Sequence, residues 1–228
     1  MSGSVAATHR RSGDEGLRMA VPRGALFGPC LDLLERAGFD VSPARAESRS
    51  LIFELGELTI ITMRPSDVPT YVEAGAADLG ITGKDVIEEQ SDREVYELVD
   101  LGFGRCRMVV AALEGDDSLE RSASRLGFMR IATKYRLIAE RYFESTGRQV
   151  EVIEVKGSVE LAPLVGLADG IVDLVDTGRT MRENGLAERE QIMVCTARLL
   201  ANRVAHKLRV DEVDSMIERL RAAGDAPK

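Results

Sequence analysis

The sequence predicts an α/β protein with mostly parallel sheets, arranged as two lobes around a cleft. Short apolar runs alternate with amphipathic segments along the chain, which is the order of strands and helices in α/β folds. A pattern of the type Asp-Leu-x-x-Thr-Gly-basic occurs twice, each time at the end of an apolar run. Because ligands bind at the carboxyl ends of strands in such folds, the two copies favour two lobes that face one cleft.

Eight apolar runs have the length and composition of strands. They are Leu17–Val21, Leu58–Met63, Leu79–Thr82, Met108–Leu113, Met129–Thr133, Val150–Val155, Gly170–Val175 and Ile192–Ala197. Between these runs, apolar residues recur at helical spacing. The predicted helices are Leu26–Ala37, Val68–Ala74, Tyr135–Ser145 and Ala162–Leu167, followed by an exposed amphipathic helix over Val210–Ala223.

Composition narrows the function classes. The 228 residues, 44% hydrophobic and 30% charged, are ordinary for a globular protein and suffice for one domain or two small lobes. A net charge of −8 with no basic stripe argues against nucleic-acid binding. No apolar run approaches the roughly 18 residues of a membrane span. Residues 1–16 are polar, so we expect a disordered tail rather than a secretory signal, and a cytoplasmic protein.

Cysteine and histidine usage disfavours metal and triad chemistry. Cys30, Cys106 and Cys195 lie far apart and lack metal-ligand spacing, so they are expected to be buried reduced thiols. His9 and His206 lie in the polar N-terminal segment and near the C-terminus. Neither a zinc site nor a histidine-based triad is therefore expected.

A phosphate-binding loop is predicted at Asp176-Thr177-Gly178-Arg179-Thr180. This segment directly follows the predicted strand Gly170–Val175 and precedes a helix-compatible stretch. A strand that turns through Thr-Gly into a helix start directs unpaired backbone N–H groups and the positive end of the helix dipole at one point. Acidic side chains at its edge offer oxygens for ribose hydroxyls or Mg²⁺. The Gly-x-x-x-x-Gly-Lys spacing of a Walker loop is absent.

The two copies of the repeated pattern, at 78–84 and 173–179, define the expected lobes. Internal duplication stays an open question, because the flanking residues align poorly. The acid-rich segment 114–117 is the expected boundary, and 190–203 is expected to cross back to the first lobe. The predicted organisation is a tail over 1–16, a first lobe over 17–112 and 190–210, a second lobe over 113–189 that holds the phosphate loop, and a C-terminal helix and tail over 211–228.

Residues in the predicted second lobe are spaced as in a known enzyme signature. They are Glu160, Gly166, Ala168, Ile171, Asp173, Thr177, Gly178, Thr180 and Met181. In this spacing the chain resembles the ATP phosphoribosyltransferase family, which catalyses the first step of histidine biosynthesis. The resemblance continues upstream through 21–24, 47–49, 63–69, 78–85 and 130–133, and it covers residues 17 to about 208. The family often has Arg where this chain has Ala25, so a cation at that position is in doubt.

The resemblance implies a fold, a reaction and a partner. The implied fold is the two-lobed type II periplasmic-binding-protein fold. The implied reaction joins N1 of the adenine of ATP to C1 of phosphoribosyl diphosphate, with Mg²⁺ carried on the substrates and diphosphate released. Too few residues follow Leu208 for the histidine-binding domain of long members. A short form is therefore expected, working in a hetero-oligomer with a regulatory subunit that resembles histidyl-tRNA synthetase.

Roles for site residues follow from the resemblance and the loop. Thr177, Gly178, Arg179 and Thr180 are expected to hold the 5′-phosphate. The candidates for the ribose hydroxyls are Asp173, Asp176 and Glu160, and those for catalytic contacts to diphosphate or to the phosphates of ATP are Arg23 and Arg49. Lys84 is a further substrate-binding candidate, and no residue is expected to hold a metal directly.

Several of these residues have structural alternatives. Asp173 could cap a strand end, and Glu160 could belong to a capping box at the start of a helix. Arg64 could form a structural salt bridge as readily as a ligand contact. Lys84 and Asp85 could cap a helix.

Two other functions share these features. A non-catalytic ligand-binding module uses the same two-lobed architecture, and other phosphoribosyl-transferring enzymes use a Thr-Gly-x-Thr loop. The missing export signal and the flanking signature residues favour the transferase.

Overall fold

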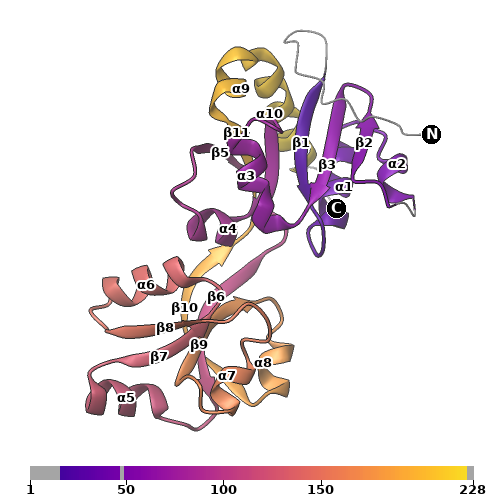
Figure 1. The fold of residues 1–228 in the computed structure, drawn as a ribbon. Coiled ribbons are helices and arrows are strands. Elements are labelled where there is room, and N and C mark those ends of the chain that lie inside the picture. Colours follow the sequence, from indigo (N-terminus) through magenta and orange to yellow (C-terminus); the bar gives the residue numbers. More distant parts are fainter. Residues whose placement is uncertain (1–15, 47–48, 225–228) are drawn as a thin grey trace, which may run out of the picture.

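The computed structural model describes residues 16–46 and 49–224, which form two lobes joined at a narrow waist (Figure 1). Most of the predicted N-terminal tail, the signature residues Glu47 and Ser48, and the last four residues lie outside the described residues. The chain passes from the first lobe to the second through residues 101–105, and it returns at Thr196.

The first lobe is built on a six-stranded sheet of order β2-β3-β1-β4-β11-β5. Its elements are β1 (Leu17–Pro22), α1 (Phe27–Arg36), α2 (Ser42–Arg45), β2 (Ile52–Leu55), β3 (Leu58–Met63), the 3-10 helix η1 (Pro65–Asp67), α3 (Val68–Glu73), β4 (Leu79–Gly83), α4 (Lys84–Glu89), β5 (Val95–Asp100), β11 (Ala197–Asn202), α9 (Arg203–Leu208) and α10 (Val210–Gly224). One face of the sheet packs against α1 and α10, and the other face packs against α3. Both faces of β1 and β4 are therefore buried, which explains their nearly continuous apolar sequences.

The second lobe is built on a five-stranded sheet of order β10-β6-β9-β7-β8. Its elements are β6 (Cys106–Leu113), α5 (Ser118–Leu126), β7 (Met129–Thr133), α6 (Arg136–Ser145), β8 (Val150–Glu154), α7 (Leu161–Leu164), β9 (Gly170–Val175), α8 (Arg179–Glu183) and β10 (Leu186–Cys195). Along β6, Met108 and Val110 enter the core beneath α5 and α6, whereas Val109 and Ala111 enter the core beneath α7 and α8. This alternation places a helical layer on each face of the sheet.

The two-lobed α/β fold is confirmed, but both sheets are mixed rather than mostly parallel. Parallel pairs join β1 to β3 and β4, and β7 to β8 and β9. The pairs β2–β3, β4–β11, β5–β11, β6–β9 and β6–β10 are antiparallel. One antiparallel pair is the hairpin β2–β3. The others involve β5, β6, β10 and β11, the strands next to the two crossings, which run against the direction of their neighbours.

The lobe boundaries differ from those predicted. Strands β6 and β10 both belong to the second sheet, so the crossings lie at 101–105 and at Thr196 rather than at 113 and 190. The predicted single strand Ile192–Ala197 is in fact the end of β10 and the start of β11, separated by Thr196. An apolar run identifies a strand but not the sheet to which the strand belongs, which is why the boundary was misplaced.

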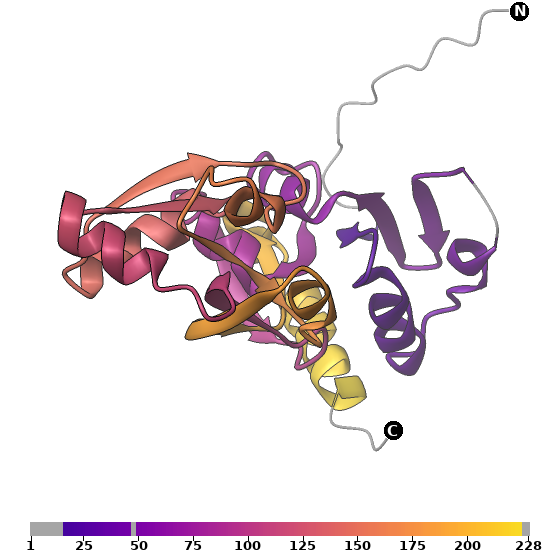
Figure 2. The same ribbon diagram turned by 90° about the horizontal axis from the view of Figure 1, so that it is seen from below.

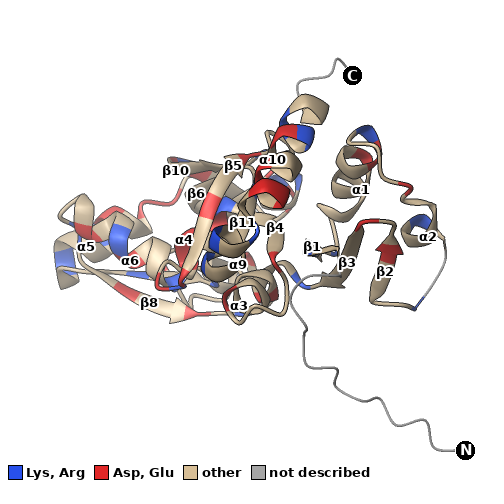
Figure 3. Ribbon diagram, turned by 90° about the horizontal axis from the view of Figure 1, so that it is seen from above, with Lys and Arg blue, Asp and Glu red and all other residues tan. Residues whose placement is uncertain are grey.

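The C-terminal helix is part of the first lobe rather than an exposed appendage. In Figure 2, α10 (yellow) lies beside α1 (indigo). Its apolar face is buried in the core of the first lobe. Arg219, on the same helix, stacks on the ring of Phe39 at 4.1 Å and donates to the carbonyl of Ala37. Elsewhere, acidic and basic residues are interspersed over both lobes (Figure 3).

Candidate functional site

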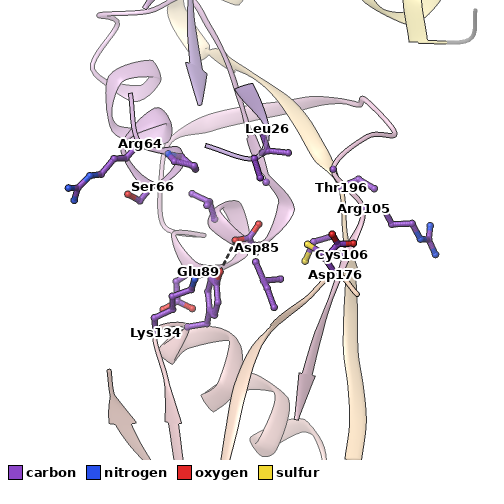
Figure 4. Close-up of a pocket in the computed structure, with 18 of the residues that line it drawn as sticks. Leu26, Arg64, Ser66, Asp85, Glu89, Arg105, Cys106, Lys134, Asp176 and Thr196 are labelled. Carbon is purple, nitrogen blue, oxygen red and sulfur yellow. Dashed lines mark hydrogen bonds between the residues drawn. The ribbon is translucent and has the colours of Figure 1, made fainter. Parts of the chain in front are cut away.

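A cleft of about 780 Å³ lies between the lobes and is lined by residues of both. The first lobe contributes Arg23, Arg64 and Asp85, and the second contributes Lys134 and Asp176. Figure 4 shows that the side chains of Arg64, Lys134 and Asp176 come from opposite sides of the cleft. The carboxyl ends of β1, β3, β4, β7 and β9 all lead into residues that line it, as expected for ligand sites in α/β sheets.

The predicted phosphate loop follows β9, and its first residue, Asp176, lines the cleft. Gly178 occupies the N-cap position of α8 with φ 72°, a left-handed conformation that glycine adopts without steric cost. The Thr177 hydroxyl accepts a hydrogen bond from the Arg179 N–H at 3.4 Å. Among the described residues, the N–H groups of Thr177, Gly178 and Thr180 have no hydrogen-bond acceptor, so they are available to an anion.

Asp173 and Glu160, two of the three predicted ribose-binding carboxylates, lie near enough in the second lobe to interact electrostatically. The Asp173 carboxylate accepts a hydrogen bond from the Leu174 N–H at 2.8 Å, and it lies 4.0 Å from the Lys134 ammonium group. Burial raises the pKa of Asp173, and the nearby charge of Glu160 raises it further. Glu160 itself occupies the N-cap position of α7, and its side chain makes no capping bond, so the capping-box interpretation was wrong.

The basic residues divide between the cleft and the outer surface. The Arg23 guanidinium is held at the cleft by hydrogen bonds to the Thr62 hydroxyl at 2.9 Å and to the Ser50 carbonyl at 2.8 Å. Arg49 is exposed and does not line the cleft. Lys84 forms ion pairs with Glu88 and Glu97, both at 2.8 Å, and lines a separate, smaller pocket.

The cleft also contains residues that sequence reasoning missed or left open. Lys134, Tyr135 and Arg105 line it and were not predicted as site residues, and Asp85 was left open between a ligand contact and a helix cap. Lys134 and Tyr135 directly follow β7, so their position at a strand end was a usable signal. Arg105 lies in the crossing segment, and nothing in the local sequence marks it.

Hydrogen bonds hold the lobes together at one side of the cleft. The Tyr135 hydroxyl donates to the Asp85 carboxylate at 3.1 Å (dashed in Figure 4). The Glu89 carboxylate accepts hydrogen bonds from the N–H groups of Leu137 and Ile138, at 3.0 and 3.1 Å. Glu89 thus caps the start of α6 from the other lobe, where the helix dipole favours a negative charge. Arg141 of α6 also donates to the carbonyl of Glu88 at 3.4 Å and to the hydroxyl of Ser91.

Replacing Asp85 by Asn should change how stability depends on pH. Burial raises the pKa of Asp85 above its ordinary value near 3.8. The unfolded chain therefore releases this proton first as the pH rises, and the parent protein loses stability between pH 3.8 and the raised folded pKa. The Asp85→Asn variant keeps an acceptor for Tyr135 without the charge, so its relative free energy of unfolding should increase across this interval. Urea unfolding at a series of pH values measures the difference.

Asp100→Asn is the control for this prediction. Partial burial acts to raise the pKa of Asp100, but hydrogen bonds from Thr196 and the Gly102 N–H lower it overall. The variant should therefore be less stable than the parent at neutral pH, and the deficit should shrink on acidification. Parallel pH profiles for the two variants would contradict the assigned role of burial at Asp85.

Neither a metal-binding group nor a membrane span stands out in the described part of the chain. It contains no cluster of three or more His, Cys, Asp or Glu side chains suited to a metal ion. None of its helices is both long enough and apolar enough to cross a membrane.

Comparison with known proteins identifies the family. Residues 64–222 match the HisG family, described as ATP phosphoribosyltransferase. The ATP phosphoribosyltransferase of Rubrobacter xylanophilus is 52% identical over 203 residues, which span 89% of this chain and 94% of that relative. This chain belongs to the ATP phosphoribosyltransferase family. The relative from Geobacillus kaustophilus is 46% identical over 213 residues, 92% of this chain and 100% of its own length.

Solved structures agree with this family. The ATP phosphoribosyl transferase (HisG:HisZ) complex from Thermotoga maritima matches with a TM-score of 0.76 at 35% identity, covering 92% of this chain and 98% of that one. The periplasmic aliphatic sulphonate binding protein SsuA from Escherichia coli, 13% identical with a TM-score of 0.59, covers 93% of this chain and 69% of its own, and shows the shared fold alone. The expected activity, phosphoribosyl transfer to ATP in histidine biosynthesis, is confirmed for the family. The alternative of a non-catalytic ligand-binding module is not favoured.

Proposed function

We propose that the interlobe cleft transfers the phosphoribosyl group to ATP, with phosphoribosyl diphosphate held by the second lobe and ATP by the first. The observation that carries this assignment is the loop after β9, where three N–H groups lack acceptors among the described residues, beside a cleft carboxylate, Asp176. Such a loop suits the 5′-phosphate, which then places the ribose near Asp176 and Asp173. Asp173, Asp176 and Glu160 are the proposed partners of the ribose hydroxyls.

The chemistry requires stabilisation of charge rather than a covalent nucleophile. As C1 of the ribose leaves diphosphate for N1 of adenine, the ribose becomes oxocarbenium-like and negative charge grows on diphosphate. Arg23 is the proposed catalytic cation for that charge, because its guanidinium is fixed at the cleft by two hydrogen bonds. Arg64, Arg105 and Lys134 add positive charge around the two polyanionic substrates.

Mg²⁺ is best treated as part of the substrates. Phosphate oxygens are the hard ligands that this ion prefers, so we infer that it enters as a complex with diphosphate and ATP. Asp85 and Asp176 line the cleft, and we propose that their carboxylates complete the coordination of this ion.

Two predicted contacts receive less support from the geometry. Lys84 is engaged by two glutamates outside the cleft, so we place Asp85, the next residue, at the substrate instead. Arg49 stays a proposed contact that would need the adjacent loop to move toward the cleft, because the residue is exposed and is not among those that line the cleft.

A regulatory partner is part of the proposal. The Thermotoga maritima structure is a HisG:HisZ complex that matches nearly the whole of this chain. We infer that this chain is likewise a short-form catalytic subunit that assembles with a subunit resembling histidyl-tRNA synthetase. A cytoplasmic location follows from this proposal, because ATP and phosphoribosyl diphosphate are made and used there.

Ultraviolet absorbance tests the proposed function. Attaching ribose to N1 of adenine alters the chromophore, so the purified chain with MgATP and phosphoribosyl diphosphate should give an absorbance change that is absent when either substrate is omitted. The assay is run with and without a HisZ subunit, and a faster change with HisZ supports the partner. A flat trace in both conditions would contradict the assigned reaction.

A further inference from the structure

Two cysteines meet where the chain crosses between the lobes. Cys106 is the first residue of β6, and Cys195 is the last residue of β10. They are directly opposite each other in the antiparallel β6–β10 pair, and both line the cleft. The sequence predicted isolated buried thiols, because the 88 residues between the two cysteines hide their proximity in the fold. Cys106 is only half-buried.

The geometry of this pair suits a disulfide. Directly opposite residues of antiparallel strands have Cα atoms about 4.5 to 5.5 Å apart and point to the same face of the sheet. Disulfides span Cα separations of about 4.4 to 6.8 Å, so the bond could form with little backbone movement. Both thiols are free in this structure, and each shifts the pKa of the other.

We propose that Cys106 and Cys195 form a reversible redox site, in which a peroxide converts the two thiols to a disulfide that locks the waist between the lobes. Disulfides in cytosolic proteins are mostly transient and redox-sensing rather than structural, which fits a pair beside a substrate cleft.

The chemistry assigns a different role to each thiol. The hydrogen bond from Cys195 lowers the pKa of Cys106, with Lys134 acting in the same direction while burial, Asp85 and Asp176 oppose it. The pKa of Cys195 is raised by the same hydrogen bond and by burial. Cys106 is therefore the attacking thiolate and Cys195 the resolving thiol. Cys30, in the core of the first lobe, is excluded because burial raises its pKa.

The oxidation is balanced in two steps. The Cys106 thiolate attacks one oxygen of hydrogen peroxide, the O–O bond breaks, and a sulfenic acid and hydroxide form. The Cys195 sulfur then attacks the Cys106 sulfur, the S–O bond breaks, and water leaves. Overall, two thiols are oxidised to one disulfide and one peroxide is reduced to two waters. A dithiol reductant reverses the change by thiol–disulfide exchange.

The disulfide should inhibit the enzyme by restraining the two chain connections between the lobes. β6 begins at the end of the first crossing segment, and β10 ends one residue before the second crossing. A covalent link between them restrains both connections at once. Two-lobed proteins close around ligands by rotating at such connections, so the oxidised protein should bind or turn over substrates poorly.

Peroxide titration of the full chain tests the proposal. With hydrogen peroxide in modest excess, intact mass should fall by the two hydrogens of one disulfide, and digestion should yield a peptide that links Cys106 to Cys195. Turnover of ATP and phosphoribosyl diphosphate should fall at least about fivefold with oxidation and recover with dithiothreitol. The mass measurement needs no activity, so its outcome is independent of the proposed function.

Single variants separate the redox site from general damage. Each variant is compared with itself before and after peroxide. Cys195→Ser should form no intramolecular disulfide and should accumulate oxidised Cys106, whereas Cys30→Ala should behave as the parent does. The proposal is overturned if the parent keeps three free thiols under peroxide, if the disulfide involves Cys30, or if the Cys106–Cys195 disulfide leaves turnover unchanged.

Discussion

Replacing Gly178 by Val is expected to raise the KM for phosphoribosyl diphosphate roughly 10- to 100-fold, the loss expected for one hydrogen bond to a charged group. Gly178 has φ 72°, and a Cβ added there would lie 2.9 Å from the Arg182 guanidinium. A β-branched residue is strained in this conformation, so the loop must shift to accommodate it. The shift moves the N–H groups of Thr177 and Thr180 away from the 5′-phosphate. The KM for ATP should change much less, because ATP is assigned to the first lobe.

Gly147→Val is the matched control for this variant. Gly147 has φ 70°, and a Cβ added there meets no atom within 4 Å. It lies between α6 and β8, away from the cleft lining. Both variants carry the backbone strain of a left-handed β-branched residue, but only Gly178→Val changes the proposed phosphate loop. Equal KM values for phosphoribosyl diphosphate in the two variants would contradict the assignment of the 5′-phosphate to this loop.

Replacing Arg23 by Ala should lower kcat/KM roughly 30- to 1,000-fold. This factor corresponds to about 2–4 kcal/mol of transition-state stabilisation, the loss expected for one electrostatic stabiliser. The Arg23 side chain is fixed by Thr62 and by the Ser50 carbonyl, and it lies 5.5 Å from the ring of Phe27. This fixation orients the cation before the substrates bind, which is the condition for a large electrostatic effect. Steady-state kinetics with each substrate varied in turn measures the loss.

Arg23→Lys distinguishes charge from geometry. Lysine keeps the positive charge but cannot reproduce the planar pair of hydrogen bonds to Thr62 and Ser50. Activity between those of the parent and Arg23→Ala is expected. If Arg23→Ala itself has near-parent kinetics, the diphosphate cation must be another cleft residue, with Arg64 and Arg105 the next to replace.

The fold was predictable where strands are buried on both faces. β3, β7 and β9 have the predicted limits, because a run of mainly apolar residues bounded by polar residues marks a largely buried strand. β2 and β5 were missed, because polar and charged residues interrupt them at exposed positions. Which strand belongs to which sheet was not predictable, since pairing depends on distant parts of the chain.

The site was predictable where one segment supplies it. The loop that contains Gly178 could be identified because strand, turn and helix start are consecutive, and the structure leaves its N–H groups available. Contacts between lobes could not be predicted, because the Glu89 cap on α6 and the Tyr135–Asp85 hydrogen bond depend on how the lobes dock. The repeated Thr-Gly-basic pattern correctly marked the end of β4, but it favoured Lys84 although Asp85 is the residue that reaches the cleft.

The order of strands in the first sheet has a consequence for how the chain folds during synthesis on the ribosome. β11 lies between β4 and β5, so these two strands have no direct pairing with each other. The second lobe is one continuous segment and can complete its own sheet as soon as β10 emerges. β5, by contrast, must wait with an unsatisfied edge until residues 197–202 follow. A nascent chain stalled with β10 outside the ribosome and β11 still inside it should therefore have a protease-resistant second lobe. The first lobe, which precedes it in the sequence, should still be incomplete.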